Sequence, residues 1–494
     1  MNFLNRLFHL DEKQTSLRKE IIGGLISFVA MCYVLPLIAS NLSSGAGMDK
    51  QGVFVITALL TVVISLIMAF VGNYPIALSS AAGINAYVAF TISGSFPRWE
   101  QRMILLTVSG LIFLILSLTK VRKWIINAIP KDVKCIISAS LGGFLLFVGL
   151  KGAGVIVSDG STLVKLGNFA DPAMMIAVMA IFVTIALFFT KVKFLRTMAI
   201  PFGILFAAIS GLISSLIMTS TGAMKVLGGV GFYQFGQLNG QASTLPIAPW
   251  LVDNMKFADL APIKNVVFFG LLRDGYTGQD FANDLGAVFS NPVSYVTIFS
   301  IIFVNLFNTT ATYLTMDEKI GVFDEEGKIN RYHRTILADS IGSAIAGPFG
   351  TTTVEPLAES NVGITTGART GCSTVIVAVM FLLSAFIYPI FSIFTASSVT
   401  APALAGIGLI ILSSSLSQLS MKKMDIIIVS MVTIILSILC FSITNGIGFG
   451  LVTYCIIKVS QGKMKEVGIP VFIITGLFVV SFIAEAVVNA LVVS

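Results

Sequence analysis

The sequence predicts an all-α, polytopic membrane protein, and three observations support this prediction. Of its 494 residues, 56% are hydrophobic and only 11% are charged, whereas soluble domains contain about 25% charged residues. Runs of about 20 apolar residues, each long enough to cross a bilayer, recur along the chain. Among them lies Gly350–Thr370, which carries two carboxylates, a proline and several threonines and glycines. Unsatisfied backbone and unpaired charge are costly in a bilayer, so this stretch should be buried in protein or line a water-accessible cavity.

The apolar runs fall into two halves of the chain. In the first half the predicted spans are Ile21–Leu42, Val53–Val71, Arg102–Thr119, Val133–Gly152, Pro172–Thr190 and Arg196–Met218. In the second half they are Pro292–Met316, Thr335–Gly347, Gly371–Phe394, Val399–Leu416, Asp425–Thr444 and Pro470–Val493. The piece Ile447–Val459 either continues the preceding helix or forms a short pass of its own.

The chain is expected to comprise four parts: residues 1–20, 21–218, 219–290 and 291–494. The first is polar, lacks a cleavable signal sequence and is expected to be cytoplasmic. Lys and Arg gather in alternate loops, which places the amino terminus of a multi-pass protein on the cytoplasmic side of the cytoplasmic membrane. The second and fourth parts are membrane repeats. The mixed connection 219–290 is expected outside, partly ordered, with too little apolar sequence for a domain of its own.

Composition also argues against several function classes. The net charge of +7 fits basic cytoplasmic loops better than a nucleic-acid partner. The five cysteines lie in or beside apolar segments without a CxxC pair, so core thiols are expected rather than disulfides or a metal site. The sequence contains no Walker loop, no zinc-ligand spacing and only two histidines. It therefore predicts neither an enzyme nor a cofactor, and any energy source should be an ion gradient.

Two apolar segments are interrupted by small and polar residues. One is Ile76–Ile92, which contains SSAAGINAY, and the other is Gly350–Gly363. Matching interrupted segments in two halves of a chain are typical of transporters with inverted repeats and a central site. Alternatively, both could be packing helices softened by glycine. The intramembrane residues Glu355 and Glu359 favour the transporter.

The interrupted segment of the first half offers Gly83 and Asn85 as candidate ligand contacts. A glycine lets the backbone approach a ligand closely, and a half-helix starting here would direct free N–H groups towards a cavity. A glycine-mediated helix contact is an equally good interpretation of this piece alone.

In the second half, Asn305 and Asn308 are three residues apart and share a helix face, with Thr309 beside them. These side chains could bind a neutral polar solute or simply bond a neighbouring helix. Burial disfavours the charged form of Glu355 and Glu359, whereas N–H donors of a helix beginning near Ser360 favour it.

A carboxylate between these two influences can accept a hydrogen bond from a ligand or carry a proton. The alternative, a glutamate paired to a helix end or a basic residue, is stronger for Glu355 than for Glu359. Asp339 could contact the residues that bind the ligand rather than the ligand itself. Glu485 is expected to be a packing or interface charge.

Taken together, these motifs resemble the nucleobase–cation symporter family, specifically its adenine/guanine/hypoxanthine permease branch. The resemblance covers nearly the whole chain. The matching pieces are RKEIIGGLISFVAMCYVL, GNYPIALSSAAGINAYVAF, INAIPKDVKCIISASLGGFLLFVGLKGAG, GTTTVEPLAES and GARTGCSTVIVAVMFLLSAFIYPI. It implies about 14 transmembrane segments as two inverted seven-segment repeats, forming a core and a gate domain. It also implies a substrate site between short strands and half-helices of segments 3 and 10.

Carried over by position, the resemblance places substrate contacts at Gly83, Asn85, Glu359 and Ser360. The eighth segment departs from the family pattern, which usually reads Asp-x-x-Asp-Thr followed by glycine. Here it reads Asn305-Leu-Phe-Asn308-Thr309, followed by Thr310 and Ala311.

The departure matters because an amide cannot bind and release a proton near neutral pH. Glu355, conversely, stands where the family tends to have a small hydroxyl residue. We therefore hypothesise that a proton-carrying charge has moved to Glu355, with Glu359 and Asp339 as the other proton-coupling candidates.

The function predicted from the residues and the resemblance is import of a purine nucleobase (adenine, guanine or hypoxanthine), with H+ as the coupling ion. One alternative is a carrier of the same fold for xanthine, uracil or a small anion, although the two glutamates argue against an anion. Another is a non-transporting membrane sensor or scaffold. Lipid contacts are expected and homodimerisation is left open.

Overall fold

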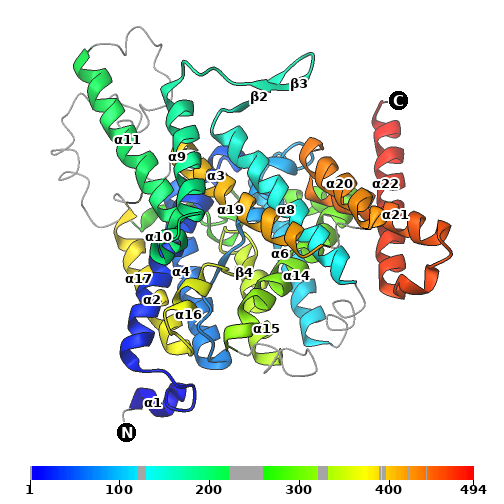
Figure 1. Cartoon of the computed structure of the whole chain (residues 1–494). Helices are drawn as coiled ribbons and strands as arrows, with labels where there is room; N and C mark the ends of the chain where they lie inside the picture. Colours follow the sequence, from blue (N-terminus) through cyan, green and yellow to red (C-terminus); the bar gives the residue numbers. More distant parts are fainter. Residues whose placement is uncertain are drawn as a thin grey trace.

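The computed structural model describes residues 3–119, 130–221, 260–320, 332–388, 391, 397–419, 423–440 and 442–493, and these form a bundle of helices (Figure 1). The helices of the first half are α1 (Phe3–Phe8), α2 (Leu17–Met31), α3 (Val34–Ala46), α4 (Lys50–Ile67), η1 (Met68–Gly72), α5 (Ala82–Ala86), η2 (Tyr87–Thr91), α6 (Trp99–Leu118), α8 (Lys131–Gly152), α9 (Pro172–Phe188), α10 (Lys193–Thr197) and α11 (Ala199–Thr221). Those of the second half are η5 (Ala261–Asn265), η6 (Val267–Gly270), α13 (Gly278–Ser290), α14 (Val293–Ile320), α15 (Tyr332–Ala346), α16 (Ser360–Thr365), α17 (Gly371–Phe386), α19 (Ser397–Ser417), α20 (Met424–Leu439), α21 (Ile443–Ser460), η8 (Met464–Glu466) and α22 (Ile469–Val493).

Every predicted span overlaps a helix, which confirms the predicted fold class. Within the described residues, five helical stretches are long and apolar enough to cross a membrane, or six if α13 and α14, bent by 85° at their junction, make one span. Other apolar helices, such as α9, α17 and α20, have 10–17 residues. The piece that was ambiguous in the sequence forms its own helix, α21, which packs against α20. The count of fourteen segments stays a prediction.

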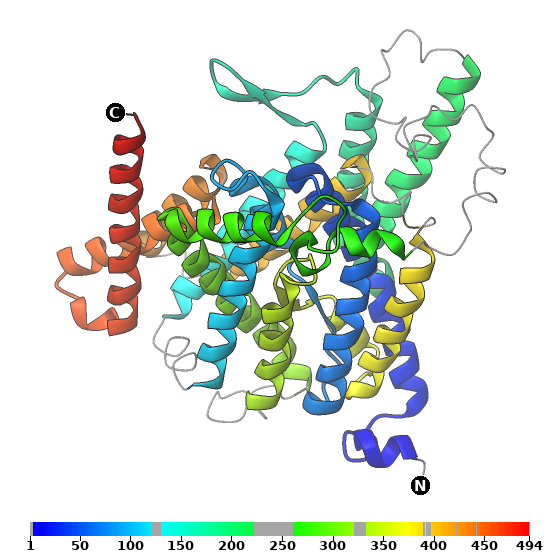
Figure 2. The same ribbon diagram turned by 180° about the vertical axis from the view of Figure 1, so that it is seen from behind.

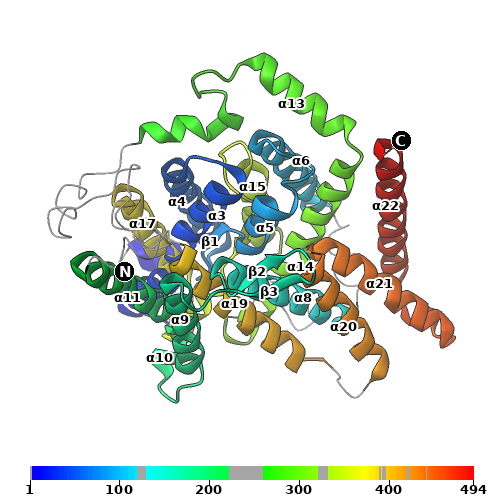
Figure 3. The same cartoon turned by 90° about the horizontal axis from the view of Figure 1, so that it is seen from above.

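Two short strands from the two halves pair in the middle of the bundle. Strands β1 (Leu78–Ser80) and β4 (Val354–Pro356) run antiparallel, with Ser79 opposite Glu355. Figure 1 shows β4 among the central helices, and Figure 3 shows β1 there from above. The ladder continues past the strands, since Ala81 N donates to Thr353 O and Leu357 N to Ala77 O. The half-helices α5 and α16 follow these strands, as predicted for the interrupted segments.

A serine satisfies the outer edge of each strand. The hydroxyl of Ser65 on α4 accepts from Leu78 N at 3.1 Å and donates to Leu78 O at 3.2 Å. On the other side, the hydroxyl of Ser343 on α15 accepts from Val354 N at 3.2 Å and donates to Val354 O at 3.1 Å. Buried backbone groups without partners are costly at membrane depth. The two serines supply partners for backbone N–H and C=O groups on the outer edges of the strands.

Helices α8 and α19 pack so closely that glycine is required at their contact. A Cβ added at Gly142 would lie 2.5 Å from Leu412 N, and one at Gly408 would lie 2.4 Å from Leu146 N. Small residues of this kind let membrane helices approach each other closely. The pair crosses the front of the strand region in Figure 1.

The region predicted as a long outer connection is ordered over residues 260–290; residues 222–259 lie outside the described part. Helix α13 crosses the bundle in the view of Figure 2 and runs along its edge, outside α6, in Figure 3. Thr277 and Asp280 form a capping box at its start. Arg273 donates to Glu100 of α6 at 2.8 Å, and Gln101 of α6 donates to Asp284 of α13 at 3.0 Å, so polar contacts hold this region to the bundle. The hairpin of β2 (Ile156–Asp159) and β3 (Leu163–Leu166) was not predicted.

Candidate functional site

The candidate site lies where β1, β4, α5 and α16 meet α14. Helix α14 contacts β4, α5 and α16. It thereby brings the eighth-segment motif to the two interrupted segments, as the sequence predicts. Neither Glu355 nor Glu359 takes part in a salt bridge with another described residue, so their immediate partners are neutral.

Glu355 is buried in β4, with 8% of its surface exposed. Its Oε2 accepts a hydrogen bond from Nδ2 of Asn308 on α14. The structure therefore joins the unusual glutamate to one of the two unusual amides. Asn308 also borders a cavity of about 10 Å³ between α14, α8 and α21, which has room for about one water molecule.

The other two eighth-segment residues, Asn305 and Thr309, have different surroundings. Nδ2 of Asn305 donates to the Ser343 hydroxyl at 3.1 Å, and Ser343 in turn bonds Val354. Asn305 thus bonds the neighbouring helix α15, which in turn holds β4. A bond to a neighbouring helix is one of the two roles that the sequence indicates for this side chain. Thr309 is fully buried, and its hydroxyl has no partner among the described residues.

Glu359 lies at the N-cap position of α16, but its side chain does not cap the helix. Instead, its Oε1 accepts a hydrogen bond from the hydroxyl of Tyr33, which stands at the break between α2 and α3. The Ser360 hydroxyl accepts from Ala77 N at 3.1 Å. Ser360 therefore links α16 to the chain entering β1, and its predicted role in substrate binding stays a prediction.

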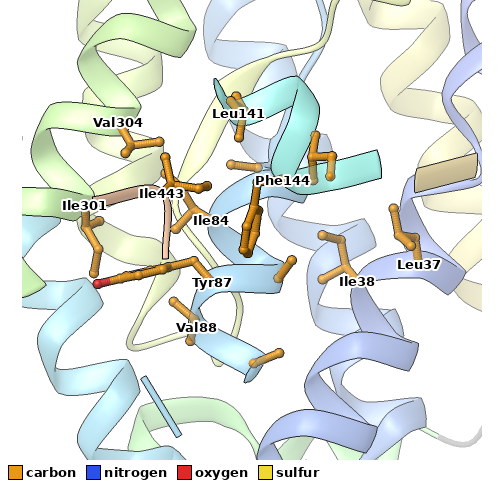
Figure 4. Packing of buried hydrophobic residues seen from close by; sticks show 14 of the residues in the cluster. Leu37, Ile38, Ile84, Tyr87, Val88, Leu141, Phe144, Ile301, Val304 and Ile443 are labelled. Carbon is orange, nitrogen blue, oxygen red and sulfur yellow. The ribbon is translucent and has the colours of Figure 1, made fainter. Parts of the chain in front are cut away.

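Gly83 and Asn85 lie on the half-helix α5, which is packed against α8. A Cβ at Gly83 would lie 2.6 Å from Cδ1 of Leu141, so α8 covers this face of α5. Figure 4 shows Leu141 and Phe144 of α8 close to Ile84 and its neighbours. Asn85 is fully buried, and neither its Oδ1 nor its Nδ2 has a hydrogen-bond partner in the described part of the chain.

The remaining acidic candidates stand in different positions. Asp339 is fully buried on α15, and its Oδ1 accepts from the Ser340 hydroxyl at 3.1 Å. Because α15 packs against β4, a supporting role for Asp339 stays a prediction. Glu485 belongs to α22, but its side chain lies outside the described part.

Sequence reasoning missed Tyr33 and a set of hydroxyl groups on α4. Thr57, Thr61 and Ser65 follow each other at four-residue intervals and so share one helix face. Thr57 bonds Thr351 at 2.9 Å, and Thr61 bonds Ser79 at 2.7 Å. The spacing was visible in the sequence and could have indicated a polar face directed at the strands. In the described residues, no group of three or more His, Cys, Asp or Glu side chains could hold a metal ion.

Solved structures of similar fold are the transmembrane domain of the bicarbonate transporter BicA of a cyanobacterium and murine Slc26a9, an anion transporter in the inward-facing state. The first is 14% identical with a TM-score of 0.56, over 89% of this chain and 98% of that one. The second is 12% identical with a TM-score of 0.53, over 90% and 68%. At such low identities, these similarities show the fold alone.

Sequence comparison is more specific. The chain is 32% identical over 486 residues to the guanine/hypoxanthine permease PbuG of Bacillus subtilis, covering 97% of this chain and 98% of the relative. It is 29% identical to the adenine permease AdeP of Escherichia coli, covering 97% and 96%. The family model described as "Permease family" matches residues 18–454. The chain is thus a multi-pass membrane protein that belongs to the permease family of nucleobase–cation symporters.

Proposed function

We propose that the protein is a secondary active transporter that imports a purine nucleobase, namely adenine, guanine or hypoxanthine, across the cytoplasmic membrane by proton symport. The relatives that are named for adenine or for guanine and hypoxanthine support this class of cargo. The orientation with a cytoplasmic amino terminus is part of the proposal and rests on the alternation of basic loops.

The observation that carries the proposal is the buried amide of Asn85 on the half-helix α5, which has no hydrogen-bond partner among the described residues. A buried amide without partners costs about 1–3 kcal/mol, so it is retained only where something else can bind it. A purine edge carries both ring acceptors and N–H donors, which complement the two ends of an amide. Glu359, held by Tyr33, offers an acceptor for a ligand N–H group.

Proton coupling is assigned to Glu355. Its carboxylate is buried, and its hydrogen-bond partner is the neutral amide of Asn308. A buried carboxylate beside a neutral partner binds a proton far more readily than one paired to a fixed positive charge. This supports the idea that the proton carrier has moved from the eighth segment to β4.

Alternating access requires part of the bundle to move relative to the site. Among the described residues, α8 packs directly against Gly83, and the cavity beside Asn308 has a volume of only about 10 Å³, which is too small for a purine. We propose that α8 and α19, joined through their glycine contact, move as a unit away from α5 and α14. This corresponds to a gate domain moving against a core domain.

Uptake of radiolabelled bases tests the proposal in cells that lack their own purine permeases. Adenine, guanine, hypoxanthine, xanthine and uracil should be compared as competitors, with the variant Asn85→Leu as the inactive control. We expect uptake that a purine competes away and that uracil does not. Absence of uptake of every base by protein shown to be folded in the membrane would defeat the proposal.

A further inference from the structure

A second cavity lies between the two proposed moving parts, beyond the outer end of the half-helix. It has a volume of about 200 Å³, and it is bordered by α3, η2, α8 and α19. Its lining includes Asn41, Ser44, Phe90, Lys151, Thr400 and Leu404. Drug-sized ligands occupy pockets of about 300–1,000 Å³, so this cavity suits a smaller solute.

The position of the cavity relates it to one side of the membrane. Lys151 and Gly152 end α8, immediately before the β2–β3 hairpin. Figure 1 shows this hairpin at the end of the molecule opposite to the amino terminus. The cavity therefore lies between the hairpin side of the membrane and the central site.

The lining offers hydrogen-bond donors around an apolar body. Asn41 is 6% exposed, and its Nδ2 has no partner among the described residues. The exposed Lys151 brings a positive charge to the edge of the cavity. The ring of Phe90 and the side chain of Leu404 supply apolar surface on which a flat molecule can lie.

A packing defect explains these features less well than a binding site does. A buried amide nitrogen without a partner destabilises the fold, whereas an apolar residue of similar size would not. The cavity is also bordered by both parts of the bundle, because α3 and η2 belong to the half-helix side and α8 and α19 to the gate. Occupation of the cavity would therefore be coupled to gate movement.

We propose that this cavity is an outer binding site at which the cargo, a planar heteroaromatic ring with hydrogen-bond acceptor atoms, is held before it reaches the central site. Asn41 and Lys151 donate to the ring acceptors, and Phe90 packs against the ring. This inference rests on the proposed function, because it takes the cargo to be a purine base.

The test compares the two sides of the membrane. Base exchange is measured in right-side-out and inside-out vesicles for the wild-type protein and for Asn41→Leu. The matched control is Ser413→Leu, which places the same side chain in the separate cavity of about 150 Å³ between α9 and α19. In Asn41→Leu, we expect KM to rise about fivefold or more for entry from the hairpin side, as for loss of a hydrogen bond. In Asn41→Leu, KM for entry from the amino-terminal side should change less than about twofold. In Ser413→Leu, KM for entry from either side should change less than about twofold.

Equal changes in KM for entry from both sides, or no change in KM on either side, would overturn the proposal of an outer binding site. Lys151→Gln, at an exposed position, gives the same test if Asn41→Leu does not fold, and it should raise KM on the hairpin side only. Failure of the proposed function is distinguishable, because the wild-type protein would then exchange no base from either side.

Discussion

Asn308 donates a hydrogen bond to Glu355, and this contact joins two positions at which the sequence departs from the usual pattern of the family it resembles. The resemblance to the family implies an acid at the position of Asn308 on α14 and a small hydroxyl residue at the position of Glu355 on β4. The two departures lie next to each other in the structure. Their proximity supports the proposal that the proton-carrying charge has moved from α14 to β4.

Replacing Asn85 should separate stability from function. Asn85→Leu removes a buried amide that has no partner among the described residues, so we expect the midpoint of thermal unfolding in detergent to stay equal or to rise. Uptake should nevertheless fall at least about tenfold, because one ligand contact is lost and the site becomes apolar. Asn305→Leu is the matched comparison, since its amide bonds Ser343 and its loss should lower stability as well. A parallel loss of stability and uptake in Asn85→Leu would contradict a ligand-binding role.

Tyr33→Phe should weaken cargo binding without unfolding the protein. The substitution removes the hydroxyl that donates to Glu359 and leaves the ring in place. A hydrogen bond to a charged group contributes about 1.5–3 kcal/mol. We therefore expect KM for the base to rise about tenfold. Tyr388→Phe is the control, because Tyr388 is also buried but packs against Phe54. Equal kinetics in wild type and Tyr33→Phe would show that Tyr33 does not position Glu359.

The two serines that border the strands should have similar effects. Ser65→Ala and Ser343→Ala each leave one backbone N–H and one C=O of a buried strand without a partner. Each change should lower the free energy of unfolding by about 1–3 kcal/mol. Ser44→Ala should have little effect, since its hydroxyl bonds carbonyls of its own helix. Midpoints of thermal unfolding in detergent measure the difference, and indistinguishable midpoints for all three variants would contradict the role of the serines.

The contact between α8 and α19 should not tolerate a larger residue at Gly408. Gly408→Leu places a side chain against Leu146 N and Gly142 O, and overpacking of this kind costs about 1–3 kcal/mol. Gly476→Leu on α22 is the control, because a Cβ there has no heavy atom of the described residues within 4 Å. Yield of monodisperse protein and its unfolding midpoint report the result. Equal values for the two variants would show that the helix pair can separate at little cost.

The sequence predicted the helices well because their cause is local. A run of apolar residues must become helical in a membrane, where each backbone group needs a partner. The predicted start of a span was also close to the observed start of its helix. Helix α9 begins at Pro172, as predicted, because Asp171 is its N-cap and proline suits the first turn of a helix. The β2–β3 hairpin was missed because its strands are short and mostly exposed.

The candidate site could be proposed from the sequence in part. Gly83, Asn85, Glu355 and Glu359 were chosen as candidates because polar or glycine residues stand out in apolar sequence, and their roles stay predictions. Their partners could not be predicted, because Tyr33 lies 326 residues from Glu359 and resembles any other aromatic residue of the bundle. Contacts between distant segments depend on the crossing of the two halves, and this crossing leaves no local signal.

Proton coupling in Glu355→Gln is the measurement that tests the account most directly. Purified protein in liposomes is given a pH gradient, and both base accumulation and base exchange at equilibrium are followed. We expect Glu355→Gln to exchange base but not to accumulate it, with uptake independent of pH. Glu466→Gln, at an exposed site outside the bundle centre, should behave as wild type. Accumulation driven by the pH gradient at an unchanged level in Glu355→Gln would contradict the assignment of the proton to Glu355.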